Sequence, residues 1–124
     1  MTSETELHRQ IHPKMLLPDG TGPSSLAFLP SEKDDYRYLS VYDGDQVSAK
    51  AAFDHYTIQQ GLASVGSFSL AVKACEALAL SVRPDPAPFP AHVVIDFGPS
   101  LTNRQRKTLA KRLRNKGSWT YRQA

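Results

Sequence analysis

Hydrophobic and polar residues alternate along four short stretches of the chain, near residues 8, 40, 68 and 94. Such a period of two is typical of a β-strand that buries one face. The stretch from Ala91 to Phe97 has the clearest pattern, and we expect it to lie in the middle of a sheet. Pro13 ends the first stretch, and the turn-forming residues 43–45 end the second. The pattern predicts a sheet of about four strands.

Two longer stretches have the helical period instead. Between residues 49 and 60, apolar side chains recur with the i, i+3, i+4, i+7 spacing of a helix that packs on a sheet. Ser48 is suited to the N-cap of this helix, and Gly61 to the residue that follows it. A second helix is expected over 102–116. Its residues at every fourth position are expected to face the body of the protein: Leu101, Gln105, Leu109 and Leu113.

The remaining segments are expected to be short or irregular. Turn formers crowd residues 18–30 and predict a loop, a short helix is expected at 73–80, and four prolines between residues 84 and 90 predict an extended connection. Together the elements predict an α+β fold, a small sheet of about four strands covered by two main helices. Four apolar side chains are expected to be buried together: Phe53, Leu70, Ile95 and Leu109.

The length of 124 residues matches one domain, so we predict a single domain over 1–124, with a basic C-terminal helix at 102–116 and a short tail at 117–124. The lone cysteine, Cys75, allows no internal disulfide, and its apolar neighbours indicate a buried side chain. The first nine residues lack the pattern of a signal peptide, and no apolar run approaches the roughly 20 residues of a spanning helix. These features predict a cytoplasmic protein with no membrane partner.

Charge divides unevenly along the chain. Residues 1–103 contain seven Lys/Arg against all twelve Asp/Glu, a balance of −5, whereas residues 104–124 contain eight Lys/Arg and no acid. Basic residues at one-turn spacing can contact successive phosphates, and aromatic residues can stack on single-stranded bases. The residues expected to bind nucleic acid are Arg104, Lys107, Lys111, Arg114, Trp119 and Arg122. The alternative is a solvated helix face.

The polar faces of two expected strands supply a different set of candidates. If the strands near residues 8 and 94 are neighbours, their histidines and a carboxylate could form one acid/base site. The candidate catalytic residues are His8, Arg9, His12, His92 and Asp96. His8 and His12 lie roughly 13 Å apart on a strand and cannot share one metal ion, so no metal site is predicted. The alternative for each histidine is a structural, hydrogen-bonded role.

Arg9 is followed by Ser24 and Ser25, by Ser40 and Tyr42, and then by the helix expected from Ala49. This order of parts resembles that of small ADP-ribosyltransferase-like folds. The resemblance implies a nicotinamide dinucleotide held by the basic strand residue and the strand serine. The acidic catalytic residue of those families has no counterpart here. Neither a phosphate-binding Gly-rich loop, a nucleophile elbow nor a CxxC pair occurs, and no cofactor is predicted.

The segments at residues 8–13, 39–44 and 91–97 read HRQIHP, LSVYDG and AHVVIDF, and residues 25–30 read SLAFLP. These segments resemble the sequences of a family of short, uncharacterised bacterial proteins, and the resemblance extends over nearly the whole chain. The resemblance implies a bacterial single-domain protein and carries no activity with it.

Three functions fit the sequence. The first is an accessory or interaction module that binds nucleic acid, another polyanion or a protein partner through the basic helix. The second is a small enzyme, ADP-ribosyltransferase-like or otherwise nucleotide-processing, that uses the His/Arg face of the sheet. The third is an immunity-like or antitoxin-like protein whose acidic body binds a basic partner.

Overall fold

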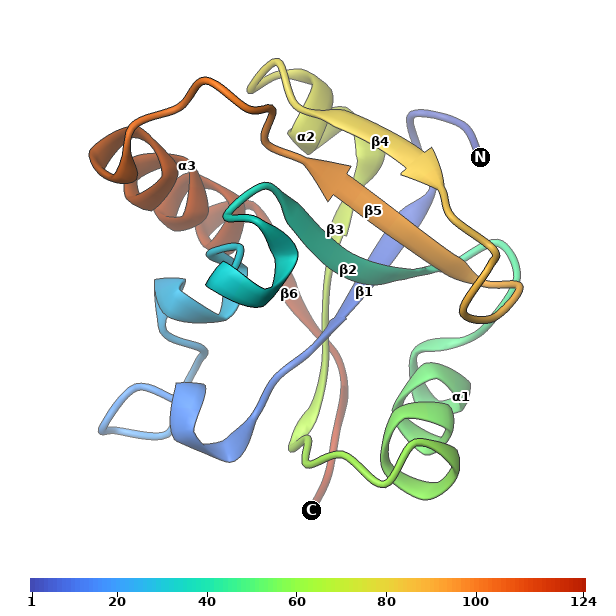
Figure 1. Ribbon diagram of the computed structural model, residues 1–124. Coiled ribbons are helices and arrows are strands. Elements are labelled where there is room, and N and C mark those ends of the chain that lie inside the picture. The colour runs from blue at the N-terminus through green and yellow to red at the C-terminus, as the bar shows by residue number, and fades with distance from the viewer.

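One antiparallel sheet runs through the computed structural model, which describes residues 1–124 (Figure 1). The six strands follow the order β4-β5-β2-β1-β3-β6. Their bounds are β1 Glu6–Gln10, β2 Tyr38–Asp43, β3 Gly66–Ala71, β4 Ser81–Pro84, β5 His92–Asp96 and β6 Ser118–Arg122. The fold is therefore α+β, with all the strands in a single sheet.

Three α-helices lie around the sheet: α1 Ala49–Asp54, α2 Val72–Glu76 and α3 Asn103–Lys116. α1 begins where the Ser48 side chain accepts the Ala51 N–H at 3.1 Å, and it continues as one turn of π-helix over His55–Gln59. α3 begins with a capping box, in which Thr102 and Gln105 each bind the other's backbone N–H. Short 3₁₀ turns occupy Pro13–Met15, Ser25–Phe28 and Glu32–Asp34. No helix combines the length and apolar character that crossing a bilayer requires.

The expectation of about four strands and two main helices was too low. The segment from Ser118 to Arg122, expected as a tail, pairs with β3 along one edge of the sheet. The start of the proline-rich connection, Ser81–Pro84, forms the opposite edge and pairs with β5. Proline lacks an N–H and is tolerated at edge positions, so Pro84 can end a strand there. α2 is also shorter than the helix expected at 73–80.

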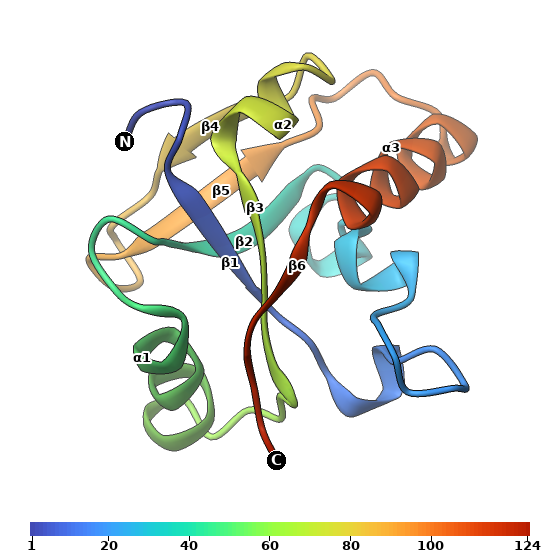
Figure 2. The same cartoon turned by 180° about the vertical axis from the view of Figure 1, so that it is seen from behind.

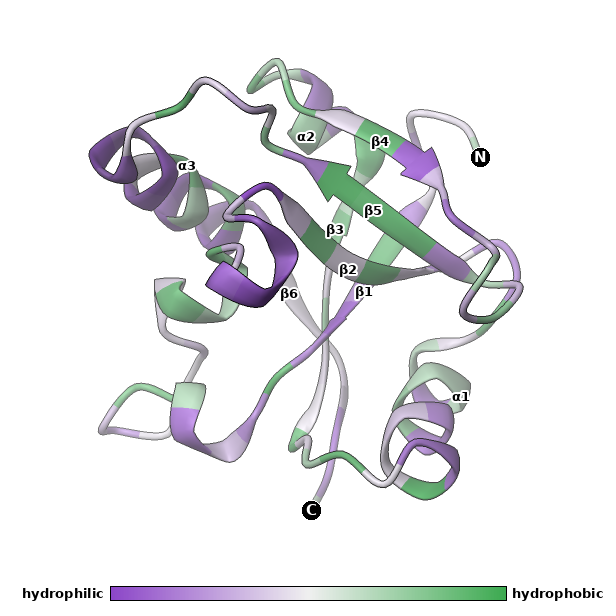
Figure 3. Cartoon of the chain, in the orientation of Figure 1, coloured by the Kyte–Doolittle hydropathy of each residue, from purple (hydrophilic) through white to green (hydrophobic).

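The two faces of the sheet differ in polarity. One carries the main core, where apolar strand residues meet α2, α3 and the turn Ser25–Phe28, and includes Leu70, Ile95 and Leu113. The other carries hydroxyl, imidazole and amide groups, and α1 covers part of it: Ser67 Oγ donates to the Ala49 carbonyl at 2.8 Å. Figure 3 shows the contrast between the hydrophobic strand β5 and the largely hydrophilic α3, and Figure 2 shows the same elements from behind.

Two of the four side chains expected to be buried together are in the main core, and a third lies at its edge. Leu70 and Ile95 are buried in the main cluster, and Leu109 packs against it while partly exposed. Phe53 is buried on α1 instead, with its ring 5.1 Å from that of Tyr121. The prediction of the buried face of α3 was also partly wrong, because Gln105 is exposed and its side chain takes part in the helix cap.

Candidate functional site

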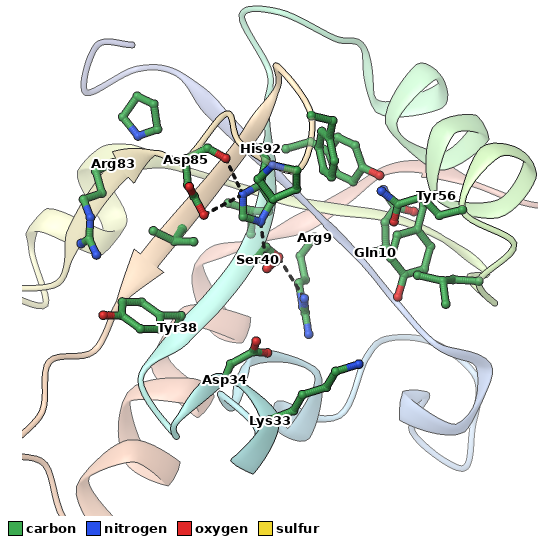
Figure 4. A pocket seen from close by; sticks show the side chains of 18 residues that line it. Arg9, Gln10, Lys33, Asp34, Tyr38, Ser40, Tyr56, Arg83, Asp85 and His92 are labelled. Carbon is green, nitrogen blue, oxygen red and sulfur yellow. Dashed lines mark hydrogen bonds and ion pairs between the residues drawn. The ribbon is translucent and has the colours of Figure 1, made fainter.

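An open pocket lies beside the place where the regular pairing of β1 with β2 stops (Figure 4). Its volume is about 910 Å³, within the roughly 300–1,000 Å³ typical of small-molecule sites. Strands β2 and β5 contribute the Ser40 and His92 side chains. The loop after β4 and the segment that follows α1 also line the pocket, and the 3₁₀ turn Glu32–Asp34 borders it.

Ser40, His92 and Asp85 form a hydrogen-bonded chain in this pocket. Ser40 Oγ lies 3.0 Å from His92 Nε2, and His92 Nδ1 lies 2.8 Å from the Asp85 carbonyl oxygen. The Asp85 carboxylate is also near, with Oδ2 3.4 Å from Nδ1. The β2–β5 register brings the first two together, because Tyr42 is opposite His92 and Ser40 is two residues along the same face. His92 is 7% exposed, whereas Ser40 is open to solvent.

Arg9 reaches the same pocket from the neighbouring strand. Pairing of β1 with β2 stops at His8 opposite Tyr42, and the Arg9 side chain occupies the space beyond. Its Nε donates to the Ala27 carbonyl at 2.8 Å, and its Nη1 donates to the Ser40 carbonyl at 2.9 Å. It makes no ion pair. Burial lowers the pKa of the guanidinium, which still remains charged at neutral pH.

The other charged groups around the pocket differ in how well they are paired. Lys33 is exposed and forms no ion pair, and the exposed Asp34 is the acidic group close enough to act on Arg9. Arg83 is neutralised, since its Nη1 donates to the Asp96 carboxylate at 2.8 Å. The two basic side chains without an ion-pair partner at the pocket are therefore Arg9 and Lys33.

Aromatic rings form the wall next to His92. Phe89 stacks on Tyr42 with ring centroids 5.0 Å apart, and its ring also lies 5.1 Å from the His92 imidazole. The Tyr42 hydroxyl forms a 2.8 Å hydrogen bond with His55 Nδ1, and burial raises the pKa of this hydroxyl. The half-buried Tyr56 lines the pocket from the segment after α1. The wall can therefore contact a planar or apolar group of a ligand.

The structure brings together only two of the five candidate catalytic residues: Arg9 and His92. Tyr42 separates His8 from His92 in the register, and His8 is bonded elsewhere, to Ser69 Oγ at 2.6 Å and to the Val47 carbonyl at 3.1 Å.

The other two candidates have structural partners. His12 is exposed and accepts the Lys14 N–H at 3.0 Å, and Asp96 binds two arginines. No group of three or more His, Cys, Asp or Glu is arranged to hold a metal ion.

The basic C-terminal residues lie on α3 and β6. Arg104, Lys107 and Lys111 are exposed, and Arg114 is half-buried with its guanidinium on Asn115. None of the basic side chains of α3 forms an ion pair.

Trp119, the aromatic residue among those expected to bind nucleic acid, packs against other side chains of the protein. The Trp119 N–H donates to the Thr21 carbonyl at 3.1 Å, its ring meets Phe68 edge-on, and the Arg122 guanidinium lies 4.6 Å over it. Its ring is therefore less available for stacking on a base than the sequence indicates.

Sequence reasoning missed Asp85 and Lys33, and it considered Ser40 only through a distant resemblance. No local motif marks these residues, because 45 and 52 positions separate Ser40 from Asp85 and His92. The pocket combines an unpaired guanidinium, a Ser–His hydrogen bond and aromatic rings. Comparisons with family models, curated proteins and solved structures find no match to this chain.

Proposed function

We propose that the protein binds a small phosphorylated molecule with a planar ring, of the nucleotide class, in the pocket between β2, β5 and the segment after α1. The small nucleotide-processing enzyme considered from the sequence would need such a binding site, and two of its five candidate residues, Arg9 and His92, line this pocket. The observation that carries the proposal is Arg9, a charged side chain at the pocket that contacts two backbone carbonyls and no carboxylate.

An incompletely paired guanidinium has a definite chemical preference. Partial burial of a charge is costly unless hydrogen bonds and an opposite charge compensate it. Nε and Nη1 donate to backbone carbonyls, and neither bond brings a negative charge to the guanidinium. Hydrogen bonds from a guanidinium group to phosphate oxygens are shorter and stronger than those to neutral acceptors. Lys33 supplies a second charge at the rim.

The wall of the pocket suits the rest of such a molecule. Phe89 and Tyr56 offer ring surfaces, the buried Tyr42 supports Phe89 from behind, and Pro84 and Pro88 add apolar contacts. Rings bind planar groups by offset stacking or edge contacts. A volume of about 910 Å³ accommodates a nucleoside monophosphate.

The proposal is tested by titrating the protein with adenosine 5′-monophosphate and with adenosine in a calorimeter. The monophosphate is expected to bind and adenosine to bind much more weakly, because only the former reaches Arg9. Lys33→Gln should weaken binding about threefold to tenfold, and Arg9→Lys by about tenfold or more. Asp34→Asn should strengthen it, since it removes a repelling carboxylate.

Lys14→Gln is the matched control, because Lys14 is exposed and outside the pocket. Thermal unfolding of Arg9→Lys checks that this variant is folded. Binding that does not change in the Lys33, Asp34 and folded Arg9 variants would refute the proposal.

A second candidate function is supported by α3. Its exposed basic residues, with no acid on the helix and no ion pair, support binding to nucleic acid or another polyanion. If Arg104, Lys107, Lys111 and Arg114 each contact a phosphate, the logarithm of the duplex-DNA binding constant should fall with log salt at a slope of about −3.6. Replacing all four by Gln should abolish retention on DNA at low salt, whereas Lys14→Gln and Lys73→Gln should not.

A further inference from the structure

Resting on the proposed function, we infer that Ser40 is a nucleophile that attacks the phosphorus atom of the bound phosphate ester, with His92 as its general base. This nucleophile adds a phosphoryl-transfer step to the ligand binding proposed above. It depends on the tautomer of His92, on the position of Asp85 and on the link between Ser40 and Arg9.

The hydrogen bonds determine which nitrogen of His92 carries the proton. The Asp85 carbonyl oxygen can only accept, so the Nδ1 that lies 2.8 Å from it must donate. In the neutral ring Nε2 then has a free lone pair, and the Ser40 hydroxyl, 3.0 Å away, donates to it. This is the arrangement in which a histidine can remove the proton of a serine hydroxyl.

Asp85 also supplies charge. Its carboxylate oxygen Oδ2 lies 3.4 Å from His92 Nδ1, so it stabilises the imidazolium that forms when His92 takes the serine proton. One residue therefore orients the ring through its backbone and supports the ring's positive charge through its side chain.

Arg9 supplies positive charge for the phosphate in the same pocket. Its Nη1 donates to the backbone carbonyl of Ser40 at 2.9 Å, and both residues line the pocket. A phosphate bound at the guanidinium therefore lies in the pocket that holds the nucleophile. A guanidinium in this position also stabilises the charge that develops on the transferring phosphoryl group.

The reaction balances in two steps. Ser40 Oγ forms a bond to phosphorus while the ester oxygen leaves; the serine proton passes to His92 Nε2 and from there to the departing alkoxide, which leaves as an alcohol. A water oxygen then bonds to phosphorus while the bond between Ser40 Oγ and phosphorus breaks; His92 takes a proton from the water and gives it to the departing Ser40 Oγ, and inorganic phosphate is released. The sum is hydrolysis of a phosphate monoester by one water molecule.

The experiment uses a fluorophosphonate, which phosphonylates activated serines, and measures the adduct by intact mass and peptide mapping. Wild-type protein should gain one adduct at Ser40. Ser40→Ala should gain none, and His92→Asn should react at least about 100-fold more slowly, the loss expected without a general base. Ser118→Ala, at an exposed serine on β6, is the matched control and should react like the wild type.

Titration of the same variants with adenosine 5′-monophosphate separates this inference from the proposed function. Ser40→Ala should still bind it, because Arg9 contacts the backbone carbonyl of residue 40. Wild-type protein that binds the monophosphate but gains no adduct at Ser40 overturns the inference and leaves the proposed function standing. Labelling of Ser40 that is equally fast in His92→Asn also overturns it. An adduct at Ser40 without monophosphate binding supports the nucleophile and refutes the proposed ligand.

Discussion

The guanidinium of Arg37 binds the carboxylate of Asp96 through two hydrogen bonds, from Nε at 2.7 Å and from Nη2 at 3.0 Å. Arg83 donates to the same carboxylate at 2.8 Å, and so does the Gly98 N–H. These partners, Arg37 first, hold the pKa of Asp96 well below its usual range. A carboxylate bound in this way joins β5, β4 and the residue before β2, and it is not available as an acid or base.

The first prediction follows from the sign of that shift. Because the folded-state pKa of Asp96 is lowered, its contribution to stability is present above the unfolded pKa of about 4 and is lost as the pH falls below it. Urea unfolding of the wild type between pH 6 and pH 2.5 should show the loss. Asp96→Asn should have a lower urea midpoint at pH 6 and a weaker dependence on pH below 4. Equal midpoints for the two proteins at pH 6 would contradict this role.

The second prediction concerns His8, which is 4% exposed. Burial lowers the pKa of its imidazole, so in acid the unfolded chain takes up the proton before the folded protein does. Stability attributable to His8 is therefore complete above the unfolded pKa of about 6.5 and decreases as the pH falls below it. His8→Asn should flatten the dependence of the unfolding free energy on pH between 7 and 5. The exposed His12→Asn is the matched control and should keep the wild-type slope.

A third prediction tests the main core. Ile95 is completely buried between β4 and β2, where Val82 and Leu39 are its strand neighbours. Ile95→Ala removes three carbon atoms and leaves a cavity, which should cost about 2–5 kcal/mol of unfolding free energy. Ile58→Ala is the comparison, since Ile58 is 76% exposed and its truncation should change stability by less than about 0.5 kcal/mol. Similar losses in both variants would show that Ile95 is not packed as described.

The fourth prediction concerns Cys75, which has no exposed surface and no disulfide partner. Burial raises the pKa of its thiol to about 12, and the thiolate is the reactive form. At pH 8 the native protein should react with a thiol reagent such as DTNB at least about 100-fold more slowly than the protein in 6 M guanidinium. Rapid reaction of the native protein would show that the segment around α2 opens readily.

Local patterns predicted much of the fold. The alternation in residues 91–97 identified β5, which has a partner on each side. Ser48 and the spacing after it predicted a helix over 49–60, where the structure has α1 and one turn of π-helix. The two edge strands were missed because their signals are weak. β4 has four residues and ends at a proline, and β6 follows a basic helix without a turn signal other than Gly117.

The pocket depends on contacts that periodicity cannot supply. Ser40 meets His92 only through the pairing of β2 with β5, and Asp85 lies on a segment that the prolines marked merely as extended. Arg9 alternates in phase with Leu7 and Ile11, and its Nε bonds the carbonyl of Ala27, a core residue. Its Nη1 reaches the Ser40 carbonyl beyond the last pair of β1 with β2, and the end of that pairing has no sequence signature.

The last prediction concerns Gly44, in the turn that the sequence indicated at residues 43–45. Its N–H donates to the Glu6 carbonyl at 2.8 Å, and a Cβ at this position would meet that carbonyl oxygen and lie 3.1 Å from the carbonyl carbon. A backbone group within an ordered strand cannot move aside as a flexible side chain would, so the added methyl group must shift β1 or the turn. Gly44→Ala should therefore destabilise the protein by about 1–3 kcal/mol, the usual cost of overpacking. Gly22→Ala is the matched control, because a Cβ there meets nothing within 4 Å. Chemical denaturation should show a lower midpoint for Gly44→Ala and little change for Gly22→Ala.

The Gly44→Ala variant should also bind the monophosphate more weakly at the pocket, because β1 carries Arg9. Unchanged stability together with unchanged binding would show that this close approach of the turn to β1 does not exist.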